Sequence, residues 1–330
     1  MKVSVVGCGN ISSTHLRILS NTENIEISSV VDIDKNKAEK AAEKYGCEAY
    51  FDFNDMLDRD KPDCVHICTP HYLHTQMSAQ ALERGIHVLC EKPCAIKKDE
   101  LDFLRRVQKN SGVQFGVCFQ NRYNEPVVKA KEIIDSGTYG KVTGIRSNVT
   151  WCRKTDYYSD EWHGKKVLEG GGVLVNQAIH TLDLIRYLSS SEVKNVSAHI
   201  FNDTLKGITD TEDTATVRYE MENGSVVLMY ATVGFSKDAD VLIEVFLEKA
   251  VIRIEGAYNA YLTQNGNTVS LTEGSVSHFH GKTYWGSGHE ALIRDFYNCI
   301  RDERHFEIDA FEGGKAVEEF LRCYESASLT

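Results

Sequence analysis

The sequence predicts an α/β protein in which a doubly wound, parallel-sheet domain precedes an α+β domain with a large, open, mostly antiparallel sheet. Two observations predict this fold class. Over the first 120 residues short β-rich runs alternate with helical runs, and after residue 190 β-branched runs follow one another between turn residues. A chain of 330 residues is also long enough for two domains.

In the first domain, expected at residues 1–121, apolar runs predict buried strands and the amphipathic runs between them predict helices. The strands are expected at residues 3–6, 27–31, 65–68, 86–90 and 113–119. The helices are expected at residues 15–20, 35–45, 73–84 and 98–109. This alternation is typical of βαβ units, so we expect a parallel sheet covered on both faces.

The second domain, expected at residues 122–330, follows a different pattern. Its helices are expected at residues 126–136, 173–188, 289–301 and 314–326. Its strands are expected at residues 142–151, 196–201, 215–219, 226–232, 241–247 and 251–255. Turn residues such as Asn223-Gly224 separate the later strands and predict a meander. The chain has 4 Pro and no linker-like run, so we expect rigidly joined domains with a site in the cleft between them.

Charge and composition favour a soluble, cytoplasmic protein. Lys and Arg number 37 against 48 Asp and Glu, a net charge of −11 that argues against nucleic-acid partners and anionic membrane lipids. No apolar run approaches the roughly 18 residues of a membrane span, and the N-terminus lacks the pattern of a signal peptide. Several of the 10 cysteines lie in apolar runs, as reduced thiols in a cytosolic protein do.

A dinucleotide fingerprint joins the first predicted strand to the first helix. Gly7 permits a tight turn, Gly9 lets backbone N–H groups approach a pyrophosphate, and Ser12 replaces the third glycine. Asp32 follows twenty residues after Ser12 and can accept hydrogen bonds from ribose hydroxyls while repelling a 2′-phosphate. These residues predict NAD as the cofactor, with NADP possible because two lysines follow Asp32 closely.

Further cofactor contacts are expected at the carboxyl edge of the same sheet, where ligands of doubly wound folds bind. These candidates are Cys8, Asn10, Ile11, Ile33, Thr69, Pro70, His74, Glu91 and Lys92.

Two clusters indicate acid–base chemistry. Glu91-Lys92-Pro93 follows a buried strand directly, and an ammonium at Lys92 can protonate or stabilise a developing alkoxide. A second cluster has three glycines followed by Asn176 and His180, which are four residues apart and would share one helix face. Asp183 could orient the His180 imidazole. The three glycines would allow the backbone to approach something flat or bulky.

Other chemistries find little support in the sequence. No CxxC pair and no HExxH occurs, and the cysteines of the run Cys64-Val65-His66-Ile67-Cys68 lie in a predicted strand, so no metal is expected. A serine hydrolase is not expected either, because the sequence has no GxSxG elbow.

Taken together, these motifs resemble the Gfo/Idh/MocA family of oxidoreductases over essentially the whole chain. The resemblance rests on residues 7–11, Asp32, Cys68-Thr69-Pro70, Glu91-Lys92-Pro93, Arg122-Tyr123 and the glycine run that leads to His180 and Asp183. It implies an N-terminal Rossmann domain and a C-terminal domain whose open sheet commonly serves oligomerisation, hence a homodimer or homotetramer. It also implies substrates that are sugars, sugar derivatives or cyclic polyols.

The resemblance also implies roles for single residues. Lys92 is similar to the family's catalytic lysine and His180 to its general acid/base, while Asn176 stands where many members have Asp. Because an amide can neither share a proton nor carry a charge, a Lys–Asp–His relay is not available here. Trp162 and His163 resemble a segment near the nicotinamide. The expected substrate-binding residues are Lys92, Arg122, Tyr157, Asn176 and His180, with Trp151, Tyr158 and Trp285 as further candidates for the pocket wall.

The predicted function is hydride transfer between a secondary hydroxyl of such a substrate and NAD(P). His180 would remove the hydroxyl proton, Lys92 would stabilise the alkoxide, and Asn176 would bind the reacting or adjacent hydroxyl. Three alternatives stay open on the same residues: a redox-neutral, NAD-dependent glycoside-cleaving enzyme, a non-catalytic NAD-binding regulator, and a reductase of a tetrapyrrole or cyclic imine.

Overall fold

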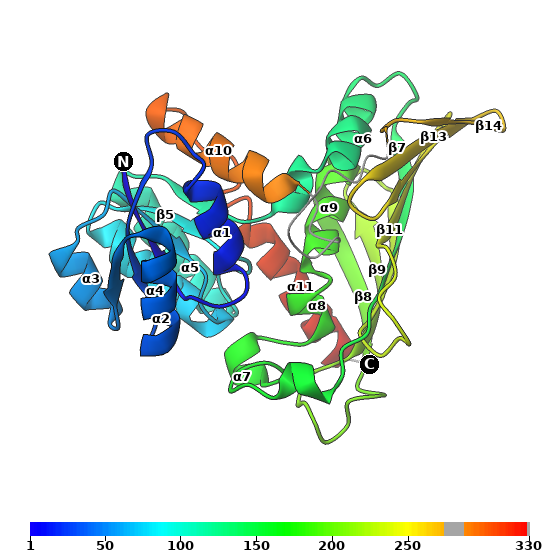
Figure 1. Ribbon diagram of the computed structural model, residues 1–330. Helices are drawn as coiled ribbons and strands as arrows, with labels where there is room; N and C mark the ends of the chain where they lie inside the picture. Colours follow the sequence, from blue (N-terminus) through cyan, green and yellow to red (C-terminus); the bar gives the residue numbers. More distant parts are fainter. Residues whose placement is uncertain (274–286, 329–330) are drawn as a thin grey trace. The chain divides into compact units, whose positions relative to one another are not determined.

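The computed structural model describes residues 1–273 and 287–328, and the chain forms two compact units in it (Figure 1). The first unit comprises Met1–Phe119 and His289–Val317, and the second comprises Gln120–Gly288 and Glu318–Thr330. The sequence predicted one change of domain, at residue 121, and therefore placed residues 289–317 in the second domain. In the structure this segment folds with the first unit.

A six-stranded parallel sheet forms the centre of the first unit, in the order β3-β2-β1-β4-β5-β6. Its strands are β1 (Lys2–Val6), β2 (Glu26–Val31), β3 (Glu48–Tyr50), β4 (Cys64–Ile67), β5 (His87–Cys90) and β6 (Phe115–Val117). Its helices are α1 (Ser12–Leu19), α2 (Lys35–Tyr45), α3 (Phe53–Arg59), α4 (His71–Glu83), α5 (Lys98–Ser111) and α10 (Gly288–Arg301). The predicted doubly wound fold is confirmed, although β3 and α3, both short, have no counterpart among the predicted elements.

Apolar packing explains why residues 289–317 join the first unit. Phe296 on α10 and Phe306 are fully buried, and both lie against Gly116 in β6, where even an added Cβ would come within 3.0 Å of their rings. The backbone N–H of Val117 donates to the carbonyl of Ile308 at 2.8 Å. A sequence pattern shows that α10 has an apolar face but not which sheet that face covers.

The second unit contains an eight-stranded sheet in the order β14-β13-β12-β11-β7-β10-β9-β8. Its strands are β7 (Val142–Thr150), β8 (Val193–Phe201), β9 (Thr214–Met221), β10 (Val226–Thr232), β11 (Leu242–Leu247), β12 (Val251–Glu255), β13 (Asn259–Gln264) and β14 (Asn267–Ser270). Every pairing is antiparallel except β7 with β10, so the predicted mostly antiparallel sheet is confirmed. The hairpin β13–β14 was not predicted, although its turn has the tell-tale Asn265-Gly266 pair, both with positive φ.

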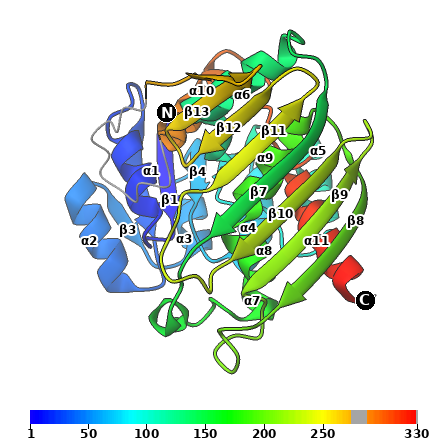
Figure 2. The ribbon, with the colours of Figure 1, turned by 90° about the vertical axis from the view of Figure 1, so that its right-hand side faces the viewer.

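Helices cover one face of this sheet and leave the other open, as Figure 2 shows. The covering helices are α6 (Glu125–Asp135), α8 (Val173–Asn176), α9 (Ile179–Ser189) and α11 (Gly314–Ser328). Along β10 the buried Val227 and Met229 alternate with the exposed Val226, Leu228 and Tyr230. The open face therefore carries apolar side chains in water.

The prediction of one helix over residues 173–188 is wrong, because the segment forms two helices. At the break, the carbonyl of Val173 accepts from the N–H groups of both Gln177 (3.2 Å) and Ala178 (2.8 Å). This wider turn ends α8 and offsets it from α9. Asn176 is thus the last residue of α8, whereas His180 lies in the first turn of α9.

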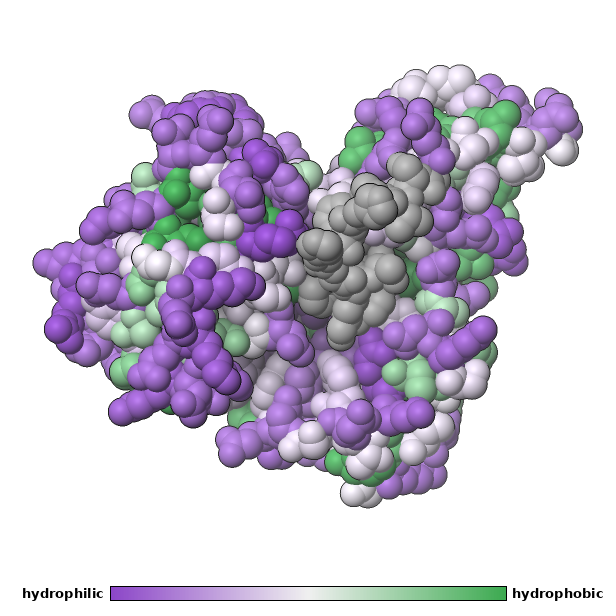
Figure 3. All heavy atoms as spheres, viewed as in Figure 1, coloured by the Kyte–Doolittle hydropathy of each residue, from purple (hydrophilic) through white to green (hydrophobic). Residues whose placement is uncertain are grey.

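The visible face of both units is largely hydrophilic (Figure 3). Within residues 1–273 and 287–328, no helix combines the length and the apolar character needed to cross a membrane. All ten cysteines are free thiols.

A buried ion pair ties the start of the second unit to α9. Arg122 lies in the 3₁₀ helix η1 (Gln120–Tyr123), and its Nε and Nη2 donate to the two carboxylate oxygens of Asp183 at 2.7 and 2.5 Å. Both side chains are at least 93% buried, and the guanidinium also lies 4.8 Å from the ring centre of Tyr187. Such a bidentate pair is costly to break, because either partner alone would be a buried, uncompensated charge.

We therefore expect Asp183→Asn to lower the free energy of unfolding by about 3–5 kcal/mol, measured by denaturant titration. The matched control is Asp102→Asn, which removes an exposed carboxylate paired with Lys98 and should change stability little. Equal effects of the two substitutions would contradict the importance assigned to the buried pair.

Candidate active site

The glycine loop after β1 has the shape that a dinucleotide phosphate needs. Gly7 has a φ of 89°, and a Cβ there would meet the carbonyl oxygen of Cys68 at 2.7 Å. No atom lies within 4 Å of where a Cβ of Gly9 would be, so the backbone is open to a ligand on that side. The Ser12 hydroxyl donates to the Gly9 carbonyl at 2.7 Å, so the serine in the third glycine position holds the loop against the N-terminus of α1.

Asp32 anchors this loop, and it is the carboxylate that the sequence predicted to bind the ribose. Its two carboxylate oxygens accept hydrogen bonds from the backbone N–H groups of Cys8 (2.7 Å) and Asp34 (2.8 Å). The side chain is half-buried, and the neighbouring Ile33 is 93% exposed. The loop and Asp32 together fit the pyrophosphate and adenosine ribose of NAD.

His74 links the two loops at the carboxyl edge of the sheet. It is buried on α4, and its ring nitrogens lie 2.7 Å from the carbonyl oxygens of Thr69 and Pro93. Thr69 and Pro70 follow β4, whereas Pro93 belongs to the loop after β5. The structure thus gives this predicted cofactor contact a role in holding the Lys92 loop against the start of α4.

Glu91 is a buried carboxylate that holds the backbone of Lys92. Its Oε2 accepts from the N–H of Lys92 at 3.3 Å, and its Oε1 lies 3.0 Å from Nε2 of His15 and 3.8 Å from Nε2 of His289. Burial raises the pKa of Glu91, but the two imidazoles outweigh burial and hold the pKa well below its ordinary value. Glu91 is therefore an ionised group that positions the residue after it.

The hydrogen bonds continue from His15 into the core of the first unit. Nδ1 of His15 lies 2.8 Å from Nδ1 of His66, whose Nε2 lies 2.7 Å from the hydroxyl of Tyr297. All three side chains are buried. Burial lowers the pKa of His66 well below 6.5, and the nearby His15 adds to this effect. We refer to Glu91, His15, His66 and Tyr297 as the buried relay.

One group of potential metal ligands occurs in the described part of the chain, formed by His15, Glu91 and Cys118. Their ligand atoms lie within 4.8 Å of one another, and all three residues are buried. Glu91 and both ring nitrogens of His15 already take part in the hydrogen bonds of the buried relay. Two of the three groups are thus already engaged in hydrogen bonds.

The buried relay predicts that acid destabilises the protein. Because the folded pKa of His66 is lowered, the unfolded chain binds a proton below about pH 6.5 that the folded chain does not. Stability should fall as the pH falls from 7 to 5, and His66→Gln should make that fall shallower by up to about 1.4 kcal/mol per pH unit. Denaturant titrations at pH 7, 6 and 5 measure the slope, with the exposed His199→Gln as control. A slope unchanged in His66→Gln would contradict the assignment.

In the second unit, the three-glycine run lets the chain pack closely against itself. A Cβ on Gly171 would lie 1.9 Å from the hydroxyl of Tyr324, and one on Gly172 would lie 1.8 Å from the carbonyl oxygen of Glu212. The Glu212 carboxylate accepts from the N–H groups of Gly172 and Leu174, both at 3.0 Å. These contacts fix the start of α8, and hence the place of Asn176 at its end. The neighbours of the glycine run are thus the side chain of Tyr324 and the backbone of Glu212, so the flat or bulky partner that the sequence predicted belongs to the protein itself.

Asn176 lies in a polar cluster with Glu169 and Tyr157. Its Nδ2 donates to Oε1 of Glu169 at 2.5 Å and to the hydroxyl of Tyr157 at 3.0 Å. Glu169 is the last residue of α7 (Lys166–Glu169), and its Oε2 accepts from the N–H of Gly164 at 2.5 Å. His180, the second residue of the next helix, is half-buried. The predicted Asn176 is thus part of a larger hydrogen-bonded group.

Two rings, those of His163 and Tyr158, pack against Tyr157 of this cluster. The ring of His163 lies 3.8 Å from that of Trp162 and 4.6 Å from that of Tyr157, centre to centre. Nδ1 of His163 lies 2.5 Å from a carboxylate oxygen of Asp160. These residues join the segment expected near the nicotinamide to the segment around Asn176. Trp285 lies outside the described residues.

Arg122 and Asp183 have partners that the sequence did not predict. Arg122 was expected to bind substrate and Asp183 to orient His180. In the structure both carboxylate oxygens of Asp183 accept from Arg122. We assign the pair to the stability of the second unit.

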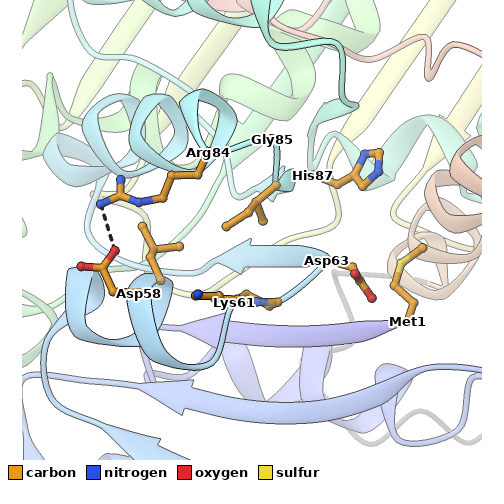
Figure 4. A pocket seen from close by; sticks show the side chains of 10 residues that line it. Met1, Asp58, Lys61, Asp63, Arg84, Gly85 and His87 are labelled. Carbon is orange, nitrogen blue, oxygen red and sulfur yellow. Dashed lines mark ion pairs between the residues drawn. The ribbon is translucent and has the colours of Figure 1, made fainter.

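A hollow of about 770 Å³ lies elsewhere in the first unit (Figure 4). It is lined by Met1, Asp58, Lys61, Asp63, Arg84 and His87, among others. Asp63 precedes β4 and His87 begins β5, so the hollow is at the amino ends of these strands. The glycine loop and Lys92 follow the carboxyl ends of their strands, so the hollow is at the opposite edge from the candidate site.

A Rossmann sheet with a dinucleotide loop in one unit, and an open eight-stranded sheet in the other, define a class of NAD-binding oxidoreductase. Comparison with known families agrees. The N-terminal domain of the Gfo/Idh/MocA family, described as "Oxidoreductase family, NAD-binding Rossmann fold", matches residues 1–119. The family's C-terminal domain matches residues 127–253. The chain belongs to the Gfo/Idh/MocA family, so the resemblance seen in the sequence is confirmed.

Characterised relatives and solved structures span much of the chain. The D-glucoside 3-dehydrogenase of Escherichia coli is 30% identical over 61% of this chain and 58% of its own length. The glucose-6-phosphate 3-dehydrogenase of Bacillus subtilis is 25% identical over 98% and 95%. A crystal structure of the WlbA dehydrogenase of Chromobacterium violaceum, in complex with NADH and UDP-GlcNAcA, has a TM-score of 0.86 and 27% identity, covering 99% of this chain and 94% of that one.

The sequence pointed to Glu91 but not to Glu169, Glu212 or the other members of the buried relay, His15, His66 and Tyr297. Glu169 directly precedes the glycine run, and a buried carboxylate beside an amide has no spacing that would reveal it. His15 and His66 lie in a helix and a strand that read as ordinary core segments. An alternation of His66 with apolar residues in a buried strand is the one signal that could have drawn attention to it.

Proposed function

We propose that this protein is an NAD(P)-dependent dehydrogenase that acts on a secondary hydroxyl of a sugar, a sugar derivative or a cyclic polyol. The observation that carries the proposal is the polar cluster of Asn176, Glu169 and Tyr157, with the half-buried His180 following Asn176 by four residues in the chain. These groups suit a ligand rich in hydroxyls. The names of the two relatives as 3-dehydrogenases of a glucoside and of a sugar phosphate support the same substrate class.

The residues proposed to hold the cofactor are Gly7, Cys8, Gly9, Asn10, Ile11, Asp32, Ile33, Thr69, Pro70, His74, Glu91, Lys92, Trp162 and His163. The open backbone at Gly9 and the carboxylate of Asp32 support NAD, because a carboxylate repels the 2′-phosphate of NADP. When bound, NAD supplies a nicotinamide carbon that accepts the hydride.

The chain's own residues then bind the substrate and handle its proton. His180 takes the proton from the reacting hydroxyl, and the ammonium of Lys92 stabilises the oxygen that is left negative. Asn176 accepts a hydrogen bond from that hydroxyl or an adjacent one. Glu91 supports Lys92 by fixing its backbone N–H. Tyr157 forms part of the proposed substrate-binding pocket, because its hydroxyl accepts a hydrogen bond from Asn176.

The first test is the absorbance of reduced nicotinamide when the protein is mixed with NAD or NADP and a panel of aldoses, glucosides, inositols and nucleotide sugars. We expect one class of hydroxylated ring to reduce NAD, and Lys92→Met to lower turnover by about 10²-fold or more with NAD affinity kept. His180→Ala should also be inactive, while Lys97→Met, at an exposed lysine nearby, should match the unaltered protein. Near-normal turnover of Lys92→Met would overturn the role of this lysine.

We also propose that the open sheet face binds a second copy of this chain in a homodimer or homotetramer. The face carries exposed apolar side chains on β8 and β10, namely Phe201, Val226, Leu228 and Tyr230. Exposed apolar patches of this kind mark interaction surfaces.

The free thiols support a cytoplasmic location.

Leu228→Lys should therefore lower the oligomeric state measured by light scattering, because it places a charge in the proposed contact. Val167→Lys, at an apolar residue on α7 that is 74% exposed, is the matched control and should leave the mass unchanged. A monomeric mass for the unaltered protein would contradict the proposed assembly.

A further inference from the structure

Two lysines follow closely after the carboxylate that is proposed to bind the ribose of the cofactor. Lys35 and Lys37 belong to the first turn of α2, and Asp32 precedes Lys35 by three residues. At this edge of a Rossmann sheet a carboxylate binds the 2′-hydroxyl of NAD, whereas a cation accommodates the 2′-phosphate of NADP. One short segment therefore carries both kinds of group, and the contacts of the lysines bear on which cofactor is preferred.

The carboxylate of Asp32 is held by the backbone. Its two oxygens accept from the N–H groups of Cys8 at 2.7 Å and Asp34 at 2.8 Å. Within residues 1–273 and 287–328, Asp32 forms no ion pair with a lysine or an arginine. Each carboxylate oxygen has a further lone pair, so the group keeps both its charge and its capacity to accept from ribose hydroxyls.

Lys37 has a carboxylate as its partner. Its Nζ lies 3.9 Å from Oδ2 of Asp34, the residue that caps the N-terminus of α2. Burial and then the charge of Asp32 raise the pKa of the Cys8 thiol to about 12, and the charge of Lys37 opposes this rise. An ammonium on this turn therefore acts on the loop that is proposed to hold the pyrophosphate.

Lys35 has an aromatic ring as its partner. Its Nζ lies 5.1 Å from the centre of the Phe51 ring, which is within the distance of a cation–π contact. Phe51 directly follows β3, and the N–H of Asp32 donates to the carbonyl of Tyr50 at 3.2 Å, so Asp32 and Phe51 follow paired strand ends. Phe51 is 38% exposed, and its ring is the one partner of the Lys35 ammonium among the described residues.

We propose that Phe51 is a specificity-determining residue, which favours NAD over NADP by holding the ammonium of Lys35 on its ring. The inference rests on the cofactor site proposed above and deepens it. To bind a 2′-phosphate, Lys35 has to leave the ring, so the contact reduces the fraction of molecules in which this cation is available. NAD has no phosphate at this position and gains nothing from the cation.

The same contact protects the carboxylate of Asp32. A lysine released from the ring would compete with the ribose hydroxyls for Asp32 and would reduce the repulsion between Asp32 and a 2′-phosphate. Both effects change the preference in the same direction, toward NADP. Phe51 therefore supports the selectivity of Asp32 without being a charged residue itself.

Two substitutions of Phe51 separate the aromatic face from the apolar bulk of the side chain. Phe51→Leu removes the face on which the ammonium rests and keeps an apolar group, whereas Phe51→Tyr keeps the face. The affinities for NADH and NADPH are measured by titration, with the fluorescence of the reduced nicotinamide as the signal. The readout is the ratio of the two dissociation constants, because an apolar contact with the dinucleotide would change both constants alike.

We expect Phe51→Leu to shift this ratio toward NADPH by about 3-fold to 6-fold, as the loss of an exposed cation–π contact implies. Phe51→Tyr should leave the ratio as it is in the unaltered protein. The shift in Phe51→Leu should shrink when the salt concentration is raised, because salt screens an exposed ammonium–phosphate attraction.

A second substitution, at Lys35, shows whether this lysine causes the shift. In the double variant Phe51→Leu/Lys35→Gln, the gain for NADPH should disappear, and Lys35→Gln alone should change the ratio less than it does in the leucine background. Lys40→Gln is the matched control, since it removes an exposed lysine of the same helix. The gain should persist in Phe51→Leu/Lys40→Gln.

An unchanged ratio in Phe51→Leu, or a gain that survives in the double variant with Lys35→Gln, would overturn the inference. The titrations need no substrate, so the two proposals fail in different ways. Cofactor binding with the expected shift, but no turnover of any hydroxylated ring, would contradict the proposed function alone. Turnover with NAD and the same ratio in Phe51→Leu as in the unaltered protein would contradict the role of Phe51 alone.

Discussion

A carboxylate inside a protein must be matched by donors, and this constraint organises the functional residues of both units. In the first unit the matched carboxylate is Glu91, with His15 on one oxygen and the backbone of Lys92 on the other. In the second unit it is Glu169, between Gly164 and Asn176. In both places the residue with the expected chemistry, Lys92 or Asn176, is a hydrogen-bond donor to a buried acid. The hydrogen bonds that stabilise the two buried carboxylates therefore also hold Lys92 and Asn176 in place.

The carboxylates of Glu91 and Glu169 differ in the groups that surround them. Glu91 is backed by a chain of imidazoles that ends at Tyr297 in the core, so its ionisation is tied to the stability of the first unit. Glu169 ends a short helix and accepts hydrogen bonds from the backbone N–H of Gly164 and from the side-chain amide of Asn176. One acid therefore acts on a backbone position and the other on the orientation of a side chain.

Close packing explains the glycines that sequence motifs single out. Gly7 is required because its φ is positive and because a Cβ there would meet the carbonyl of Cys68. At Gly9, two residues further on, the space beside the backbone is open. Gly172 is required by the carbonyl of Glu212, a contact within the protein. The two glycine motifs look alike in sequence, yet one leaves the backbone open at Gly9 and the other brings two backbone segments together. Only the neighbours of each glycine distinguish these uses.

The sequence by itself determined the fold class, the family and the residues that follow the strands of the first unit, because alternating periodicity and glycine spacing are local properties. Only the tertiary structure decided that residues 289–317 complete the first unit, that residues 173–188 form two helices, and that Arg122 binds Asp183. These depend on which distant surfaces meet, which no local pattern encodes. The same holds for Glu169 and His66, whose importance comes from neighbours brought close by folding.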